Sequence, residues 1–139
     1  MTFEEKGTWI QAVMVLGVAV VYGWIVMGRA QDAPVEDIAY QAPMLWCIGI
    51  SVVVSILATI VAAVANPEEA DKKDERDREI HRTGEYFGQY LLVLGAVAAL
   101  GLAMTEQAHF WIAQALFAGF VLQGITSAVV KIRAYRRGL

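Results

Sequence analysis

The chain has 139 residues, of which 58% are hydrophobic and only 18% are charged, with a formal net charge of −3. This composition excludes an ordinary soluble domain and favours an integral membrane protein. The sequence shows no nucleic-acid-binding motif, and its single cysteine, Cys47, cannot form an internal disulfide.

Four runs with almost no charge divide the chain, and each meets the length of about 20 residues that a helix needs to cross a bilayer. They predict spans at about 8–28, 43–65, 85–104 and 109–131 within one transmembrane domain, residues 1–139. The first run is longer than the apolar core of about 7–15 residues in a cleaved signal peptide. The predicted fold class is therefore all-α, an integral membrane four-helix bundle.

The basic residues indicate how the bundle is oriented. Every Lys and Arg except Arg29 lies before the first span, between the second and third, or after the fourth. Basic residues accumulate in the cytoplasmic loops of membrane proteins. We therefore expect both termini in the cytoplasm (N-in/C-in), together with the segment that joins the second span to the third.

That joining segment is dense in charges of both signs. Asn66 suits the N-cap and Pro67 the first turn of a helix. Opposite charges recur four residues apart, as at Asp74 and Arg78, in the order that stabilises a helix. The pattern predicts a cytosolic helix over about 67–83, a helical extension between the second and third spans. This helix has no apolar face with which to bind a membrane surface.

The charged helix carries two sets of candidate site residues. The set for partner recognition is Asp74, Glu75, Arg76, Asp77, Arg78 and Glu79. The second set shares one helical face and consists of Asp74, Asp77, His81 and Glu85. Carboxylates and imidazole at this spacing are candidate metal ligands. The simpler interpretation pairs His81 with Asp77 on a solvated face, so we predict no metal and no cofactor.

Small and polar residues within the spans are the candidates for helix packing, because a bilayer gives no hydrophobic drive for helix association. They are Gly84, Gly88, Gly95, Ser51, Ser55, Thr59, Gln114, Gly119 and Gln123. Packing within the bundle is the preferred interpretation, and the alternatives that stay open are a homo-oligomer contact and the lining of a polar pore.

The interiors of the four predicted spans contain no Asp, Glu, Lys or Arg. Ionisable groups inside a membrane commonly mark ion pathways, so their absence favours a non-catalytic accessory, regulatory or sensory subunit. The expected partners are the lipid bilayer and further copies or other subunits of a larger membrane complex, with no nucleic acid. The alternative is a small oligomeric transporter or channel for an ion or small polar solute. A third hypothesis is a metal-dependent activity at the cytosolic face.

Four segments carry a resemblance to a known family. They are FEEKGTW at Phe3–Trp9, DERDREI at Asp74–Ile80, HFWIAQALF at His109–Phe117 and AYRRG at Ala134–Gly138. Together they resemble an uncharacterised bacterial family of small four-helix integral membrane proteins, a domain of unknown function with a cytoplasmic DERD-type motif. The resemblance spans nearly the whole chain, although the family has Asn where Gln114 stands. It implies a protein of the bacterial cytoplasmic (inner) membrane and no established activity.

Overall fold

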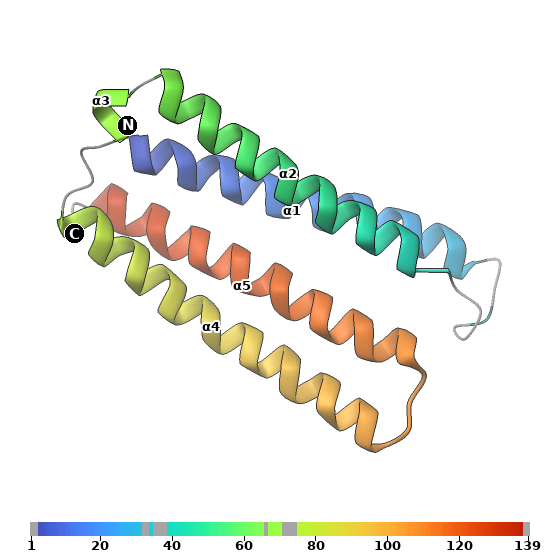
Figure 1. Cartoon of the computed structure of the whole chain (residues 1–139). Coiled ribbons are helices and arrows are strands. Elements are labelled where there is room, and N and C mark those ends of the chain that lie inside the picture. Colours follow the sequence, from blue (N-terminus) through green and yellow to red (C-terminus); the bar gives the residue numbers. More distant parts are fainter. Residues whose placement is uncertain (1–2, 32–33, 35–38, 66, 71–74, 138–139) are drawn as a thin grey trace.

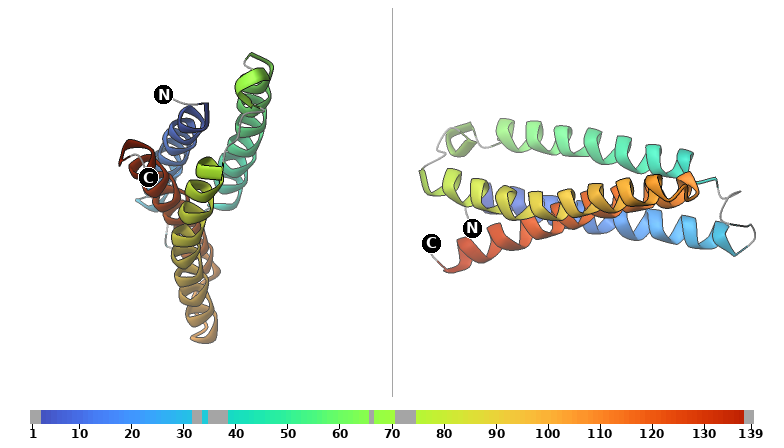
Figure 2. Two further views of the ribbon diagram at one scale, coloured as in Figure 1. Left: turned by 90° about the vertical axis from the view of Figure 1, so that its left-hand side faces the viewer. Right: turned by 90° about the horizontal axis from the view of Figure 1, so that it is seen from below.

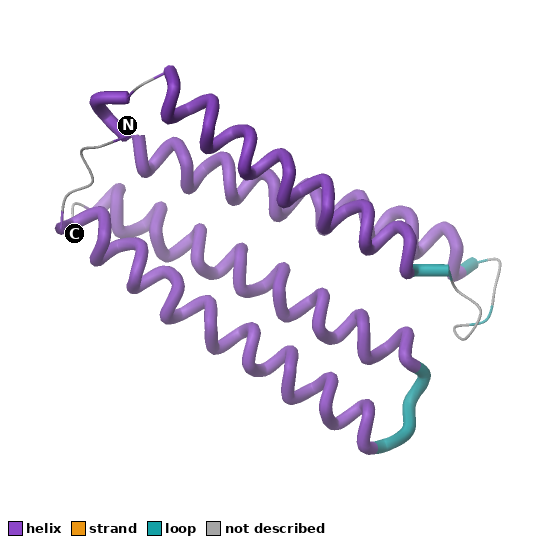
Figure 3. The backbone as a smooth tube through the Cα atoms, viewed as in Figure 1, coloured by secondary structure: helices purple, strands orange, loops and turns teal. Residues whose placement is uncertain are grey.

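The computed structural model describes residues 3–31, 34, 39–65, 67–70 and 75–137. Five helices follow one another in the order α1 (Phe3–Ala30), α2 (Gln41–Ala65), α3 (Pro67–Ala70), α4 (Glu75–Met104) and α5 (His109–Arg137). Within the described residues every regular element is a helix (Figure 3). The predicted all-α class is confirmed.

Four of the helices are long and apolar enough to cross a membrane, namely α1, α2, α4 and α5. They contain the four spans expected from the sequence. The predicted helix over 67–83 corresponds to α3 and the first turns of α4, while residues 71–74 lie outside the described part of the chain. At about 1.5 Å per residue, the 30 residues of α4 extend about 45 Å, which exceeds the thickness of the hydrocarbon core.

The helices form an open bundle in which α5 is the central member. Helix α5 lies between α4 and α1, and α2 lies beside α1 at the outer edge (Figures 1 and 2). The start of α1, the end of α5, α3 and the start of α4 are all at one end (Figure 1). We call this end the charged end, because the charged segment 75–82 lies there.

Helices α4 and α5 approach each other most closely, because glycines face one another between them. A Cβ atom added to Gly95 would lie 2.7 Å from the Cα atom of Gly119, closer than real Cβ contacts. Nearer the charged end, a Cβ atom at Gly88 would lie 2.8 Å from the carbonyl oxygen of Gln123. Small residues thus allow the two backbones to touch, as they do in membrane helix pairs.

A tight turn connects α4 to α5. The Glu106 amide donates to the carbonyl of Ala103 (3.1 Å), and the Gln107 amide donates to the carbonyl of Leu102 (3.0 Å). This is the Schellman arrangement that ends many helices. Glu106 has a φ of 57° at the position where glycine is usual. The turn makes α4 and α5 an antiparallel hairpin whose free ends meet at the charged end.

A small apolar cluster holds α1, α2 and α5 together at the end opposite the charged one. It consists of Tyr22, Val26, Tyr40 and Phe110. The Tyr22 hydroxyl also donates a 2.7 Å hydrogen bond to Oε1 of Gln114, on α5. Nε2 of Gln114 is buried and has no hydrogen-bond partner among the described residues.

Helix α2 contributes little to the interior. Pro43 is its only buried residue, and large apolar side chains such as Trp46 and Val64 are exposed along it. The hydroxyls of Ser51 and Thr59 donate to carbonyls of their own helix, at 2.8 Å in each case. The Ser55 hydroxyl donates to Sδ of Met14 on α1 at 3.6 Å, so one of these three hydroxyls contacts a neighbouring helix.

Candidate functional site

The most strongly connected polar group of the described residues lies between α4 and α5 near the charged end. Oε1 of Glu85 accepts hydrogen bonds from Nζ of Lys131 (2.7 Å) and Oγ of Ser127 (2.8 Å). Its other oxygen, Oε2, accepts a bond from Nε2 of Gln123 (3.2 Å). One carboxylate on α4 thus collects donors from three residues on α5, and the ammonium–carboxylate bond is of the stronger, charge-assisted kind.

Burial differs between the two charged partners. The Lys131 side chain is only 4% exposed, whereas that of Glu85 is 40% exposed. Lys131 packs on Gly84, where an added Cβ atom would lie 2.6 Å from its Cγ. The missing side chain of Gly84 therefore makes room for the Lys131 stem. The ion pair is buried from one side only, so its carboxylate remains accessible.

A second set of contacts fixes the first turns of α4 against the last turns of α5. The Tyr135 hydroxyl donates to Oδ1 of Asp77 (3.0 Å). The guanidinium of Arg76 donates to the Tyr135 carbonyl at 3.4 Å. One turn further along α4, Ile80 is buried, with 4% of its surface exposed. Both hydrogen bonds and this burial hold the start of α4 in one orientation on α5.

That orientation leaves a different set of charges exposed. Glu75, Arg78, Glu79 and Arg82 line a shallow hollow on the exposed side of α4. Their signs alternate along the helix, and all four are exposed. The charged segment therefore has an inner face bonded to α5 and an outer face available to another molecule.

The structure separates the residues that were predicted to recognise a partner. Glu75, Arg78 and Glu79 lie on the outer face, whereas Asp77 is buried against Tyr135. Arg76 is exposed but donates to α5. Asp74 lies outside the described residues. Arg82, which was not among the predicted recognition residues, belongs to the outer face.

The predicted metal candidates are not gathered into a cluster in the described part of the chain. The side chains of Asp77 and Glu85 bond to different residues of α5. No three His, Cys, Asp or Glu side chains come together among the residues described. Asp74, the remaining carboxylate of that set, is outside them.

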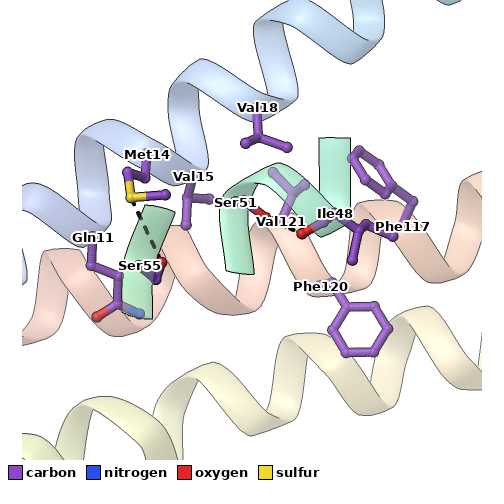
Figure 4. A pocket seen from close by; sticks show the side chains of 10 residues that line it. All are labelled: Gln11, Met14, Val15, Val18, Ile48, Ser51, Ser55, Phe117, Phe120 and Val121. Carbon is purple, nitrogen blue, oxygen red and sulfur yellow. Dashed lines mark hydrogen bonds between the residues drawn. The ribbon is translucent and has the colours of Figure 1, made fainter. Parts of the chain in front are cut away.

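The predicted packing residues fall into two groups. Gly84, Gly88, Gly95, Gly119 and Gln123 lie in the contact between α4 and α5, and Gln114 bonds to α1. Ser51 and Ser55 instead line a cavity of about 330 Å³ between α1, α2 and α5 (Figure 4). Most of its lining is apolar, including Val15, Val18 and Phe117. Thr59, Gln89 and Gln123 are not part of that lining.

The ion pair of Glu85 and Lys131 was not predicted, although the sequence carries a signal for it. Glu85 comes directly before one charge-poor run, and Lys131 comes directly after the next. The two runs are joined by a turn of four residues, 105–108. An antiparallel hairpin with so short a turn places residues about equally far from it side by side. Glu85 and Lys131 lie 20 residues before Thr105 and 23 residues after Ala108, so the hairpin brings them within one helical turn of each other.

No family model, curated protein or solved structure matches this chain. The resemblance to the DERD-type family therefore stays a prediction, and the functional argument rests on the site itself.

Proposed function

We propose that this chain is a non-catalytic integral membrane protein, an accessory, regulatory or sensory subunit that recognises a protein partner through the outer face of α4. That face consists of Glu75, Arg78, Glu79 and Arg82. In this proposal α1, α2, α4 and α5 span the cytoplasmic membrane of a bacterium. Both termini and the charged end lie in the cytoplasm.

The observation that carries the proposal is the division of the charged segment into an inner and an outer face. Packing on α5 gives the start of α4 a fixed orientation. Here Asp77 and Ile80 pack inward and hold the alternating outer charges in a defined arrangement. A preorganised pattern of charges determines the choice and orientation of a partner more than raw affinity.

The asymmetry of basic residues supports the proposed orientation. The charged end brings together the start of α1, the start of α4 and the end of α5 (Figure 1). These elements carry eight of the eleven Lys and Arg residues. Cytoplasmic loops are enriched in these residues. An orientation with the charged end in the cytoplasm therefore agrees with the distribution of most Lys and Arg residues.

Exchanging the charges of the outer face tests the proposal without altering net charge. The variant carries Glu75→Arg, Arg78→Glu, Glu79→Arg and Arg82→Glu, so the basic residues that govern insertion keep their number. Proteins co-purifying with it from native membranes are then quantified against the wild type. We expect loss of at least one specific partner, because like charges would now face each other across the interface.

The matched control is Arg133→Glu, which changes an exposed charge on α5 at the same end of the molecule. This control should retain the full set of co-purifying proteins. If the charge-exchanged variant retains that same set in the same amounts, recognition through the outer face is excluded.

A further inference from the structure

The cavity between α1, α2 and α5 has the size and the lining of a site for a small apolar molecule. Its volume of about 330 Å³ lies within the range of about 300–1,000 Å³ that is usual for ligand pockets. Val15, Val18, Phe117 and Val121 are among its apolar lining residues (Figure 4). An empty apolar cavity loses dispersion contacts along its walls, and such cavities exclude water and bind apolar molecules.

The cavity is accessible from the side at which α2 faces α5. Helix α2 packs on α1, whereas its contacts with α5 are few. Figure 2 shows α2 set apart from α4 and α5. In a bilayer, this side would face the acyl chains of the surrounding lipid, so these chains are the apolar groups with direct access to the cavity.

One polar group at one end of the cavity is left without a partner. Gln11 is the first lining residue along α1 and Ser55 the last along α2, so both lie nearer the charged end (Figure 4). The hydroxyl of Ser55 donates to Sδ of Met14 (3.6 Å), and that of Ser51 donates to the carbonyl of Ile48 (2.8 Å). The exposed Gln11 side chain makes no hydrogen bond within the part of the chain that the structure describes. Its amide can therefore bind a polar atom of the occupant.

Trp9 indicates the depth of this polar end in the bilayer. The guanidinium of Arg136 lies over the Trp9 ring, 5.4 Å from its centroid, and Trp is enriched at the membrane–water interface. Gln11 is about 3 Å further along α1 than Trp9, and Val18 is about 10 Å beyond Gln11. The free amide thus lies just below the interface, and the apolar end of the cavity lies within the hydrocarbon. A phospholipid has the same order, with an ester carbonyl at the interface and an acyl chain beneath it.

The cavity is too small for a helix of another protein or of a second copy. A helix with its side chains is about 10 Å wide, so a segment about 10 Å long occupies about 800 Å³. This is more than twice the volume of the cavity. A single acyl chain is much narrower, and its carbonyl oxygen is an acceptor for the amide of Gln11.

We propose that the cavity holds one acyl chain of a membrane phospholipid, whose ester carbonyl oxygen accepts a hydrogen bond from Nε2 of Gln11. The chain enters between α2 and α5 and lies along Val15, Val18 and Phe117. This inference rests on the membrane placement in the proposed function and adds a lipid site to it. The site lies on helices other than α4, which carries the outer face.

Native mass spectrometry of the full chain, released from nanodiscs, tests the proposal. The nanodiscs contain palmitoyl-oleoyl phosphatidylethanolamine, with palmitic acid and a ubiquinone added as competing apolar molecules. We expect one phospholipid to stay bound to each chain. The mass of the bound molecule distinguishes the three candidates directly.

Filling the cavity from two different helices should displace the lipid. Ser51→Phe acts from α2 and Val18→Phe from α1. Each should lower the phospholipid-bound fraction about tenfold or more, because overfilling a packed space costs at least that factor. The matched control is Val52→Phe, at an exposed position of α2 outside the lining, and it should retain the lipid. Two variants on separate helices distinguish displacement from a packing defect of one helix.

Removing the free amide should weaken the site less. Gln11→Leu should lower the bound fraction about threefold, the effect of one hydrogen bond of average strength in a membrane. Its control is Gln89→Leu, which removes an exposed amide of α4 that does not line the cavity. This control should leave the bound fraction unchanged.

The possible failures are distinct. A wild-type chain without bound lipid, or equal retention in Ser51→Phe, Val18→Phe and Val52→Phe, would overturn the lipid site. Bound palmitic acid or ubiquinone in place of the phospholipid would overturn the assignment of the occupant. Each of these results leaves partner recognition standing if exchanging the charges of the outer face still removes a partner. Loss of that partner effect with the phospholipid still bound would overturn the recognition proposal alone.

Discussion

The hairpin of α4 and α5 and the pair of α1 and α2 are both long and apolar enough to cross a membrane, but they are packed in different ways. In the first, Gly84, Gly88, Gly95 and Gly119 are all closely approached by the opposite helix. In the second, Gly7, Gly17, Gly23, Gly28 and Gly49 have no atom within 4 Å of an added Cβ. Glycine therefore serves close helix contact in one half of the molecule and has no such role in the other.

Polar groups follow the same division. Between α4 and α5 they bond across the helices, as Glu85 does to Ser127 and Lys131. In α2 the hydroxyls of Ser51 and Thr59 bond within the helix, and Ser55 makes one weak contact with the sulfur of Met14 on α1. The α4–α5 hairpin is therefore the more closely packed part of the molecule, and it carries the charged outer face of α4. Helices α1 and α2 add apolar surface and the cavity.

The largest expected difference between the two halves comes from filling glycine positions. Gly95→Leu should destabilise the protein by about 3 kcal/mol or more, because the new side chain meets the backbone of Gly119 and the helices must separate. Gly17→Leu is the matched control on α1. It should be neutral or slightly stabilising, since the site is open and Leu favours helix more than Gly does.

Unfolding by SDS in mixed micelles, followed by circular dichroism, measures both variants against the wild type. Equal losses of unfolding free energy at Gly95 and Gly17 would contradict the contrast between the two halves.

The second expected effect concerns the bonds that Glu85 makes from α4 to residues of α5. Glu85→Leu leaves the Lys131 ammonium buried without its carboxylate, and removal of one partner of a buried ion pair is costly. Because the Glu85 side chain is 40% exposed, the expected loss is reduced to about 2 kcal/mol. Glu85→Gln keeps an acceptor and should lose less.

Glu79→Leu is the control for this second effect, since it removes a carboxylate from the exposed side of the same helix. It should change the unfolding free energy by less than about 0.5 kcal/mol. The same micelle titration compares the three variants. A loss at Glu85 no greater than that at Glu79 would show that the ion pair does not hold the hairpin.

The sequence predicts the helices well, because charge-poor runs of about 20 residues have a single physical meaning. It predicts less well which side of each helix packs against the other helices and which side is exposed. Asp77 and Glu79 are equally charged neighbours, and only the position of α5 places one inside and the other outside. Ser51 is among the predicted packing residues, yet its hydroxyl donates to the carbonyl of Ile48 in its own helix, an option open to any helical serine.

The pair of Glu85 and Lys131 shows where prediction from the sequence could have gone further. The sequence pattern groups Glu85 with the carboxylates of the charged helix as a candidate metal ligand, and it makes Lys131 one of the basic residues that flank the fourth span. Considering the two spans as one hairpin places both residues at the same level. Pairing is a property of two helices and their turn, so it does not follow from either run alone.

The smallest expected effect tests the connection between the two halves. Tyr22→Phe removes the only hydrogen bond that the Gln114 side chain makes among the described residues, and the side-chain amide then lies partly buried without any partner. The expected loss is about 0.5–1.5 kcal/mol. Tyr86→Phe is the matched control, since its hydroxyl bonds to Tyr90 on the same exposed helix side, and it should cost less.

Combining Tyr22→Phe with Gln114→Leu should restore part of the stability, because an apolar pair leaves no unsatisfied group behind. Near-ultraviolet circular dichroism during the micelle titration reports on the tyrosines directly. If Tyr22→Phe costs no more than Tyr86→Phe, the hydrogen bond does not join the halves. The apolar cluster of Tyr22, Val26, Tyr40 and Phe110 would then be the main link between α1 and the α4–α5 hairpin at that end.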